Sequence, residues 1–279
     1  MKLKSLLCFL ILMFATSCLA AGPEIFMMAK PVSAASSTPS TIFGANLEYW
    51  FRGDQTACGA GAGTCPGNNG NCTDGAIVNQ LCDYSGNRHT ASKAAGGIQP
   101  TYVASALNGK PGANLTGGTC VYGISSPFTP TNISGFAVVS VPNLSSYLGI
   151  HGSCTYTSGS AEWRIDQTSG DMHIIKEAVA DVGSSSSGIT SGTYHKIAYT
   201  YNSSTGSLSF YIDSDSVVNT TTNVQSFSSA LNGIFGANAS GDYFNGTIME
   251  LVVTNSTATS GQVTSMMGSS GYFKSRYGL

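Results

Sequence analysis

Charged residues are scarce in this chain, since Asp, Glu, Lys and Arg together make up only 9% of its 279 residues. Lys and Arg form no cluster anywhere, so the sequence lacks the basic surface that binds a nucleic-acid phosphate backbone. No self-similarity with a period of about 20 to 50 residues is visible, which argues against a solenoid or propeller. We therefore expect neither a nucleic-acid partner nor a repeat architecture.

Motifs of several catalytic classes are missing as well. The Gly-x-Ser-x-Gly elbow of serine hydrolases does not occur, and the four histidines form no zinc-binding pair: His89, His151, His173 and His195. Glycoside hydrolysis needs two nearby carboxylates, for which Asp213 with Asp215, or Glu162 with Asp166, have suitable spacings. The first pair stands at a predicted hairpin end, where acidic turn residues are common. The sequence thus favours binding over catalysis.

The N-terminus has the three regions of an export signal. Lys2 and Lys4 precede the apolar run 6–14, and small residues follow it. This run is short for a membrane span. We predict a signal peptide over residues 1–21 and a secreted or cell-surface protein, with no membrane span in the mature chain. The alternatives are a retained membrane anchor, a lipid attached at Cys18, or a protein carried on a phage particle.

Cysteine usage agrees with export. Two of the eight cysteines, Cys8 and Cys18, lie in the predicted signal peptide. An even number remains, which in an oxidising compartment favours disulfides over zinc, because no Cys-x2-Cys pair occurs. The first four of these suggest two bridges across a local loop and the last two a third, with the pairing left open: Cys58, Cys65, Cys72, Cys82, Cys120 and Cys154.

The rest of the chain reads as short strands. After an Ala-, Ser- and Pro-rich linker (22–41), bursts of aromatic and β-branched residues alternate with Gly, Ser, Thr and Asn. We predict one domain over 42–279: an all-β jelly-roll β-sandwich of two antiparallel sheets, with a short C-terminal helix interrupted by glycines. Segment 181–192 is expected to be a loop. Strands are expected at residues 42–52, 120–124, 135–141, 147–156, 162–165, 172–178, 196–201, 208–212, 234–237 and 246–254.

Residues 79–111 stand apart from this pattern. Glycines and prolines interrupt the segment too often for regular structure, yet apolar residues recur in it. Its run from Asp83 to Asn87 has polar side chains that can bond their own backbone, and a glycine free to take a positive φ. We predict an ordered, function-bearing loop held by the sheet.

Six segments of the sequence form a set that occurs together in one family: LEYWFR (47–52), DYSGN (83–87), QPTY (99–102), LNGKP (107–111), FNGTIMELVV (244–253) and GYFKSRYGL (271–279). Together they resemble the laminin-G-like domains of the concanavalin A-like lectin/glucanase superfamily, in the bacterial or phage form. The resemblance implies a β-sandwich of two curved antiparallel sheets that recognises glycans or proteins.

The resemblance also implies a structural calcium ion, because some relatives hold one between the DYSGN loop and the last long strand. Carried over, the ligands are Asp83, Asn87 and Glu250. Met249 stands where those relatives have a second acidic residue, so main-chain oxygens would have to supply several ligands. The alternative is that Asp83 forms an Asx-turn and Glu250 bonds to loop amides.

Sugar recognition requires an exposed aromatic face with polar groups at its rim. We predict Tyr84 and Tyr243 as ligand-binding aromatics, with Asp242 and Asn245 beside the second. The resulting hypothesis is an exported, non-catalytic module that binds a carbohydrate or surface polymer. The alternatives are a glycoside hydrolase or polysaccharide lyase on the same fold, and a structural surface or virion protein. The sequence leaves the ligand and the oligomeric state open.

Overall fold

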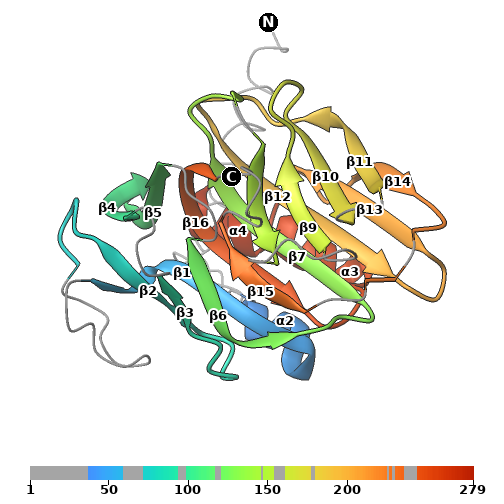
Figure 1. Ribbon diagram of the computed structural model, residues 1–279, viewed down its shortest axis with the longest axis horizontal. Helices are drawn as coiled ribbons and strands as arrows, with labels where there is room; N and C mark the ends of the chain where they lie inside the picture. Colours follow the sequence, from blue (N-terminus) through green and yellow to red (C-terminus); the bar gives the residue numbers. More distant parts are fainter. Residues whose placement is uncertain are drawn as a thin grey trace, which may run out of the picture. The chain divides into compact units, whose positions relative to one another are not determined.

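β1 (Leu47–Cys58) is the strand from which the sheet is most easily followed. In the computed structural model it pairs antiparallel with β16 (Asn245–Thr254) on one side and with β2 (Val78–Asp83) on the other. Pairing places Trp50 opposite Val252 and Phe51 opposite both Leu251 and Asp83. The first and last long segments of the chain are therefore neighbours in the sheet (Figure 1).

The described part of the chain forms one unit, Ser37–Leu279. Residues 37–41, which the sequence assigns to a linker, are part of this unit, whereas the predicted signal peptide lies outside the described residues. No helix in the described part is long and apolar enough to cross a membrane. The structure describes residues 37–58, 72–93, 99–116, 121–145, 147–153, 161–176, 180–224, 226–227, 230–235 and 244–279.

The remaining elements are mostly short strands, with helices at both ends of the unit. The helical elements are α2 (Pro39–Phe43), η1 (Gly44–Asn46), α3 (Ser260–Met267) and α4 (Tyr272–Tyr277). The other strands are β3 (Ala91–Lys93), β4 (Thr101–Leu107), β5 (Lys110–Thr116), β6 (Tyr122–Phe128), β7 (Ile133–Ser140), β8 (Leu148–Gly152), β9 (Ala161–Ile165), β10 (Asp171–Lys176), β11 (Ala180–Gly188), β12 (Tyr194–Asn202), β13 (Ser207–Ile212), β14 (Val217–Thr221) and β15 (Leu231–Ile234).

All described strands are joined in one antiparallel sheet. Its hydrogen-bonded order is β11-β10-β9-β8-β15-β6-β3-β2-β1-β16-β7-β12-β13-β14, with the β4–β5 hairpin attached to β16. The two end strands meet, because Asn219 of β14 donates a hydrogen bond to the carbonyl oxygen of Ser184 in β11 over 2.7 Å. The predicted all-β antiparallel character is confirmed. The predicted division into two sheets is not, because β6, β3 and β2 continue the ladder and the sheet nearly closes.

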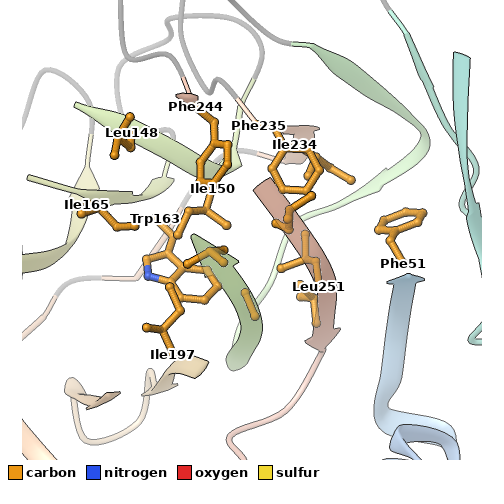
Figure 2. Packing of buried hydrophobic residues seen from close by; sticks show 14 of the residues in the cluster. Phe51, Leu148, Ile150, Trp163, Ile165, Ile197, Ile234, Phe235, Phe244 and Leu251 are labelled. Atoms are coloured by element: carbon orange, nitrogen blue, oxygen red, sulfur yellow. The ribbon is translucent and has the colours of Figure 1, made fainter. Parts of the chain in front are cut away.

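Strands β7, β12 and β16 are buried along almost their whole length, which agrees with apolar residues on both of their faces. Alternate residues such as Phe51, Leu251 and Ile197 point into an inner core inside the sheet, to which Trp163 also belongs (Figure 2). Their sequence neighbours belong to a second cluster that includes residues of α2, α3 and α4. Each large apolar side chain buried in this way stabilises the fold by about 1.5–3 kcal/mol.

The C-terminal tail confirms the predicted short, broken helix. Thr259 and Gln262 form a capping box at the start of α3, and the Gln262 amide also donates to the carbonyl oxygen of Ile42. Between α3 and α4, a Cβ on Gly268 or Gly271 would lie 2.6 or 2.9 Å from the carbonyl oxygen of Thr264. Only glycine fits this close approach, so the interruption is built into the packing.

Two segments expected to be loops contain strands. Residues 79–111 include most of β2, all of β3 and β4, and the start of β5, and the longest described loop among them is the segment between β2 and β3. Asn108 and Gly109, with φ of 48° and 72°, provide the two-residue turn that favours a β-hairpin. Residues 181–192 likewise contain most of β11, whose Ser- and Gly-rich sequence carries no apolar alternation. Pairing with β10 gives this segment its strand conformation.

One predicted disulfide is located among the described residues, between Cys58 and Cys72. Cys82 is also disulfide-bonded, and its partner must lie outside the described residues because Cys58 and Cys72 bond each other. The other predicted disulfide cysteines lie outside the described residues: Cys65, Cys120 and Cys154. The loop after β1 is therefore stapled at its base, as its cysteine spacing indicates.

Candidate functional site

The loop after β2 is fixed to the rest of the sheet by the Asp83 carboxylate. Its Oδ1 accepts hydrogen bonds from the backbone N–H groups of Trp50 and Ser85, both over 2.9 Å. Its Oδ2 accepts the Ser85 hydroxyl over 2.7 Å and the His89 N–H over 3.0 Å. Asp83 is buried, so these four bonds satisfy a carboxylate that would otherwise be costly to bury. The loop begins as an Asx-turn, which is the alternative to a calcium ligand that the sequence offered for Asp83.

Asn87 anchors the far side of the same loop. Its side-chain amide donates to the carbonyl oxygens of Leu47 and Glu48 over 2.7 and 2.9 Å. His89 Nε2 lies 3.1 Å from Glu48 Oε1. The described contacts therefore tie the loop to β1, which is linked in turn to Glu250 of the final long strand through Trp50 and to Asn255 just after that strand through Glu48.

Glu250 of β16 is buried and surrounded by donors. Its Oε1 accepts the indole N–H of Trp50, and its Oε2 accepts the Tyr277 hydroxyl over 2.6 Å. Arg276 Nε lies 3.3 Å from the same Oε2. Burial raises the pKa of Glu250 above its usual value, although the hydrogen bond from Tyr277 and the charge of Arg276 oppose the shift. Glu250 thus bonds to side chains of β1 and α4, and none of these partners is a loop amide.

These contacts decide whether the three residues suit a calcium ion. Calcium needs 6–8 oxygen ligands, but every carboxylate oxygen of Asp83 and Glu250 accepts a hydrogen bond. The Asn87 amide nitrogen faces main-chain oxygens, and Arg276 places a cation against Glu250. As they lie, these residues do not fit the ion, and the described residues contain no group of three or more His, Cys, Asp or Glu that could hold a metal.

A chelator should therefore leave the melting temperature unchanged. Hydrogen-bond donors of the protein satisfy the Asp83 carboxylate, and donors together with the Arg276 guanidinium satisfy that of Glu250, so EDTA removes nothing that holds the loop to β1. Thermal unfolding followed by circular dichroism, with EDTA and with added CaCl2, measures the effect. A melting temperature that falls in EDTA and returns with calcium would contradict this expectation.

An exposed aromatic ring stands above this buried frame. Tyr84 is 43% exposed. The Arg52 guanidinium carbon lies 4.6 Å from its ring centroid, and the Trp50 ring meets it edge-on at 5.1 Å and 89°. The Arg52 side chain is only 13% exposed, so it covers the protein side of the ring and leaves the other side to solvent. We call Tyr84, Arg52, Trp50 and Asp54 the Tyr84 platform.

Two arginines hold the charged edge of this platform. Arg52 binds Asp54 through two N–H groups, both over 2.8 Å, a rigid bidentate geometry. Arg276 donates to Asp54 Oδ2 over 2.8 Å. Burial alone would raise the pKa of Asp54, but the hydrogen bonds and charges of the two arginines outweigh it and lower the pKa. The carboxylate and both guanidinium groups therefore stay charged and in fixed positions.

The sequence missed Arg52, Asp54 and Arg276 as site residues. Arg52 and Asp54 are two positions apart in a strand, which places both side chains on one face, and this spacing could have revealed the first pair. Arg276 is 222 positions from Asp54, and no local pattern connects them. Its contribution depends on α4 packing against β1 and β16.

Other predicted ligand-binding residues are not brought to the platform. Asn245 pairs with Thr116 at the start of β16, roughly 17 Å along the strand from Glu250 at ~3.3 Å per residue. Tyr243 and Asp242 lie outside the described residues. Of the predicted ligand-binding set, only Tyr84 is thus placed on an exposed surface.

The structure places the candidate catalytic carboxylates in different surroundings. Asp213 Oδ2 lies 2.7 Å from His195 Nδ1. Glu162 is buried in β9, while Asp166 accepts the backbone N–H groups of Thr168 and Ser169 in the turn before β10. Asp213 and Asp215 thus line one pocket at the end of β13, whereas Glu162 lies inside β9 and Asp166 in the turn after it.

Comparison with known proteins agrees with the fold. Residues 134–264 match a family described as the concanavalin A-like lectin/glucanases superfamily, so the resemblance is confirmed over that range. No curated protein matches the sequence. Among solved structures, the chain is similar to domain 4 of a GH43 extracellular arabinanase from Geobacillus stearothermophilus in complex with arabinotriose. That match has 17% identity and a TM-score of 0.52, and covers 78% of this chain and 97% of the other.

Two further structures share the fold. One is a GH54 α-L-arabinofuranosidase soaked with 4-nitrophenyl α-L-arabinofuranoside, at 13% identity and a TM-score of 0.57, covering 85% of this chain and 65% of that one. The other is Trypanosoma rangeli sialidase in complex with sialic acid, at 13% identity and a TM-score of 0.50. The match covers 85% of this chain but only 35% of the sialidase. At these identities the likeness is one of fold alone.

Proposed function

Because residues 134–264 match the concanavalin A-like lectin/glucanases superfamily, we propose that this chain is an exported, non-catalytic module that binds a carbohydrate or surface polymer. The observation that carries the proposal is the exposed ring of Tyr84, held in place by Arg52 and Trp50. An aromatic face stacks on the C–H groups of a sugar ring, while polar groups at its edge bond the hydroxyls. The Tyr84 platform has both kinds of group.

Rigidity supports the same proposal. Trp50, Asp83 and Glu250 hold the base of the platform through buried hydrogen bonds, and two arginines hold Asp54. A side chain that is already ordered loses little conformational entropy on binding. Asp54 and the arginines can then accept from and donate to sugar hydroxyls without rearrangement.

We also propose that the nearly closed sheet works as two curved layers. The layer containing β1, β16, β7, β12 and β13 has helices packed on its outer face, while β6, β15, β8, β9 and β10 contribute residues only to the inner core. This difference supports two faces with separate roles, of which the helix-bearing face carries the platform.

Binding should depend on Tyr84. A glycan array identifies ligands, and arabinan oligosaccharides are the first probes because the similar arabinanase domain was solved with arabinotriose. We expect Tyr84→Ala to weaken binding about tenfold through loss of stacking, worth ~1.4 kcal/mol, and Tyr84→Phe to retain it. Affinities are measured by isothermal titration calorimetry.

Val217 provides the matched control, since it is the other exposed large hydrophobic residue in the described part of the chain, at 50% exposure. Val217→Ala should bind as the unaltered chain does. Equal affinity of the Tyr84→Ala variant would rule out the platform. Release of new reducing ends from a bound polysaccharide would instead support the hydrolase alternative.

A further inference from the structure

A polar pocket, separate from the Tyr84 platform, lies where β12, the end of β13 and the two C-terminal helices meet. Its volume is about 280 Å³, and the polar side chains around it are those of Lys196, Asp213, Ser214, Asp215, Ser269 and Lys274. The void behind Arg52 and Glu250, at about 10 Å³, has room for one water at most. The larger pocket is close to the lower size limit of small-molecule sites, roughly 300 Å³.

One acceptor of this pocket is held rigidly. Asp213 Oδ2 lies 2.7 Å from His195 Nδ1, and Asp213 Oδ1 accepts the backbone N–H of Lys196 over 3.1 Å. Burial lowers the pKa of His195, but the hydrogen bond and charge of Asp213 outweigh it and raise the pKa. The Asp213 side chain nevertheless remains 48% exposed. Its carboxylate is thus oriented by the protein and still open to a ligand.

The donors of the pocket are two lysine amines. Lys196 Nζ donates to the main-chain oxygen of Leu279 over 3.1 Å, and Lys274 Nζ donates to that of Gly278 over 2.8 Å. An ammonium group has three donors, so each lysine retains donors beyond these bonds. The Ser214 hydroxyl accepts the Ser216 N–H over 3.0 Å and keeps its own proton to donate.

We propose that this pocket binds a single neutral sugar ring, as a second site separate from the Tyr84 platform. Two lysines and two aspartates line the pocket. The charges of these four side chains cancel, so they favour neither an anionic nor a cationic ligand. Hydroxyl groups both donate and accept, and they match this mixture of amines, carboxylates and serines. Leu279, which unlike Met267 is not fully buried, adds an apolar residue to the lining against which ring C–H groups can pack.

The size of the pocket limits the ligand to one sugar ring. Helix α4 contributes a residue to each of the two sites, so a single polymer can contact both. Arg276 of α4 holds Asp54 of the platform, and Lys274 of the same helix lines the pocket. A polysaccharide engaging both sites would gain avidity. The choice of a sugar rests on the proposed function, whereas the pocket itself does not involve Tyr84.

Saturation-transfer NMR on the full chain tests the pocket, with L-arabinose, D-galactose, D-glucose and D-galacturonate as probes. We expect at least one neutral sugar to bind more tightly than galacturonate. Asp215→Asn and Lys274→Met should each weaken binding of the neutral sugar about tenfold, while Tyr84→Ala should leave the affinity for that sugar unchanged. Thermal melting of both pocket variants verifies that they fold.

Three outcomes would overturn the proposal: no monosaccharide binds, only galacturonate binds, or the two pocket variants bind neutral sugars as the unaltered chain does. Each outcome leaves the platform untouched, because the platform is tested separately by the effect of Tyr84→Ala on oligosaccharide binding. Loss of oligosaccharide binding in the Tyr84→Ala variant, with monosaccharide binding retained, would support both sites independently.

Discussion

Replacing Arg276 with methionine is expected to lower the free energy of unfolding by about 3–5 kcal/mol, the usual cost of leaving a buried charge without its partner. Arg276 links the buried Glu250 carboxylate to Asp54. Without the arginine, Glu250 keeps its hydrogen bonds from Trp50 and Tyr277. It loses its cationic partner, because among the described residues only Arg276 forms an ion pair with it. Urea denaturation followed by circular dichroism measures the change.

The pH dependence of the Arg276→Met variant identifies the cause. Because burial raises the pKa of Glu250, the folded state binds a proton more readily than the unfolded state does. Protonation removes the buried charge, so the deficit should shrink as the pH falls toward the pKa of Glu250 and be greatest above it. A deficit that is constant with pH would show that lost packing, and not the unpaired carboxylate, destabilises the variant.

Two further variants control this experiment. Glu250→Gln combined with Arg276→Met removes both charges, and the double variant should recover part of the loss because the two residues are in contact. Lys274→Met changes a residue two positions from Arg276 on the same helix. Among the described contacts, the Lys274 amine bonds only the carbonyl oxygen of Gly278, at the exposed end of α4. Its effect on stability should stay within about 0.5 kcal/mol. Equal losses for Lys274→Met and Arg276→Met would contradict the assignment.

Replacing Asp83 with alanine is expected to cost about 2–4 kcal/mol and to loosen the platform. The substitution leaves three backbone N–H groups without their acceptor, while the Ser85 hydroxyl can still donate to the Glu48 carbonyl oxygen. Unsatisfied buried donors cost roughly 1–3 kcal/mol each before water compensates the exposed ones. Hydrogen exchange of the Trp50, Ser85 and His89 amides should accelerate. Since Tyr84 follows Asp83 directly, oligosaccharide affinity should fall as well.

Asp74 offers a matched control for Asp83. Its carboxylate accepts one backbone N–H, from Ala104 over 2.9 Å, in an exposed position. Asp74→Ala should therefore cost only about 0.5–1.5 kcal/mol. Asp83→Asn keeps one acceptor oxygen, so its loss in free energy of unfolding should lie between those of Asp83→Ala and Asp74→Ala. Unchanged exchange at Trp50 and His89 in the Asp83→Ala variant would rule out the loop anchor.

Local patterns predicted the elements that depend on neighbouring residues. The hairpin of β12 and β13, the last strand β16 and the interrupted C-terminal helix follow from alternation, turn residues and glycine positions. β11 was missed because its Ser- and Gly-rich sequence offers no apolar alternation, and only pairing with β10 makes it a strand. The Asn108-Gly109 turn carried a usable signal, but the surrounding glycines and prolines suggested a loop.

The sequence by itself predicted an antiparallel all-β chain with a short, interrupted C-terminal helix, and it offered an Asx-turn after β2 and an exposed Tyr84 as hypotheses. These features depend on backbone preferences and on side chains a few positions apart. Tertiary structure alone decided that β11 meets β14, that Trp50 donates to Glu250 200 positions away, and that Arg276 joins Asp54. Such contacts depend on how distant strands and helices pack, and residue spacing does not specify which polar groups will then meet.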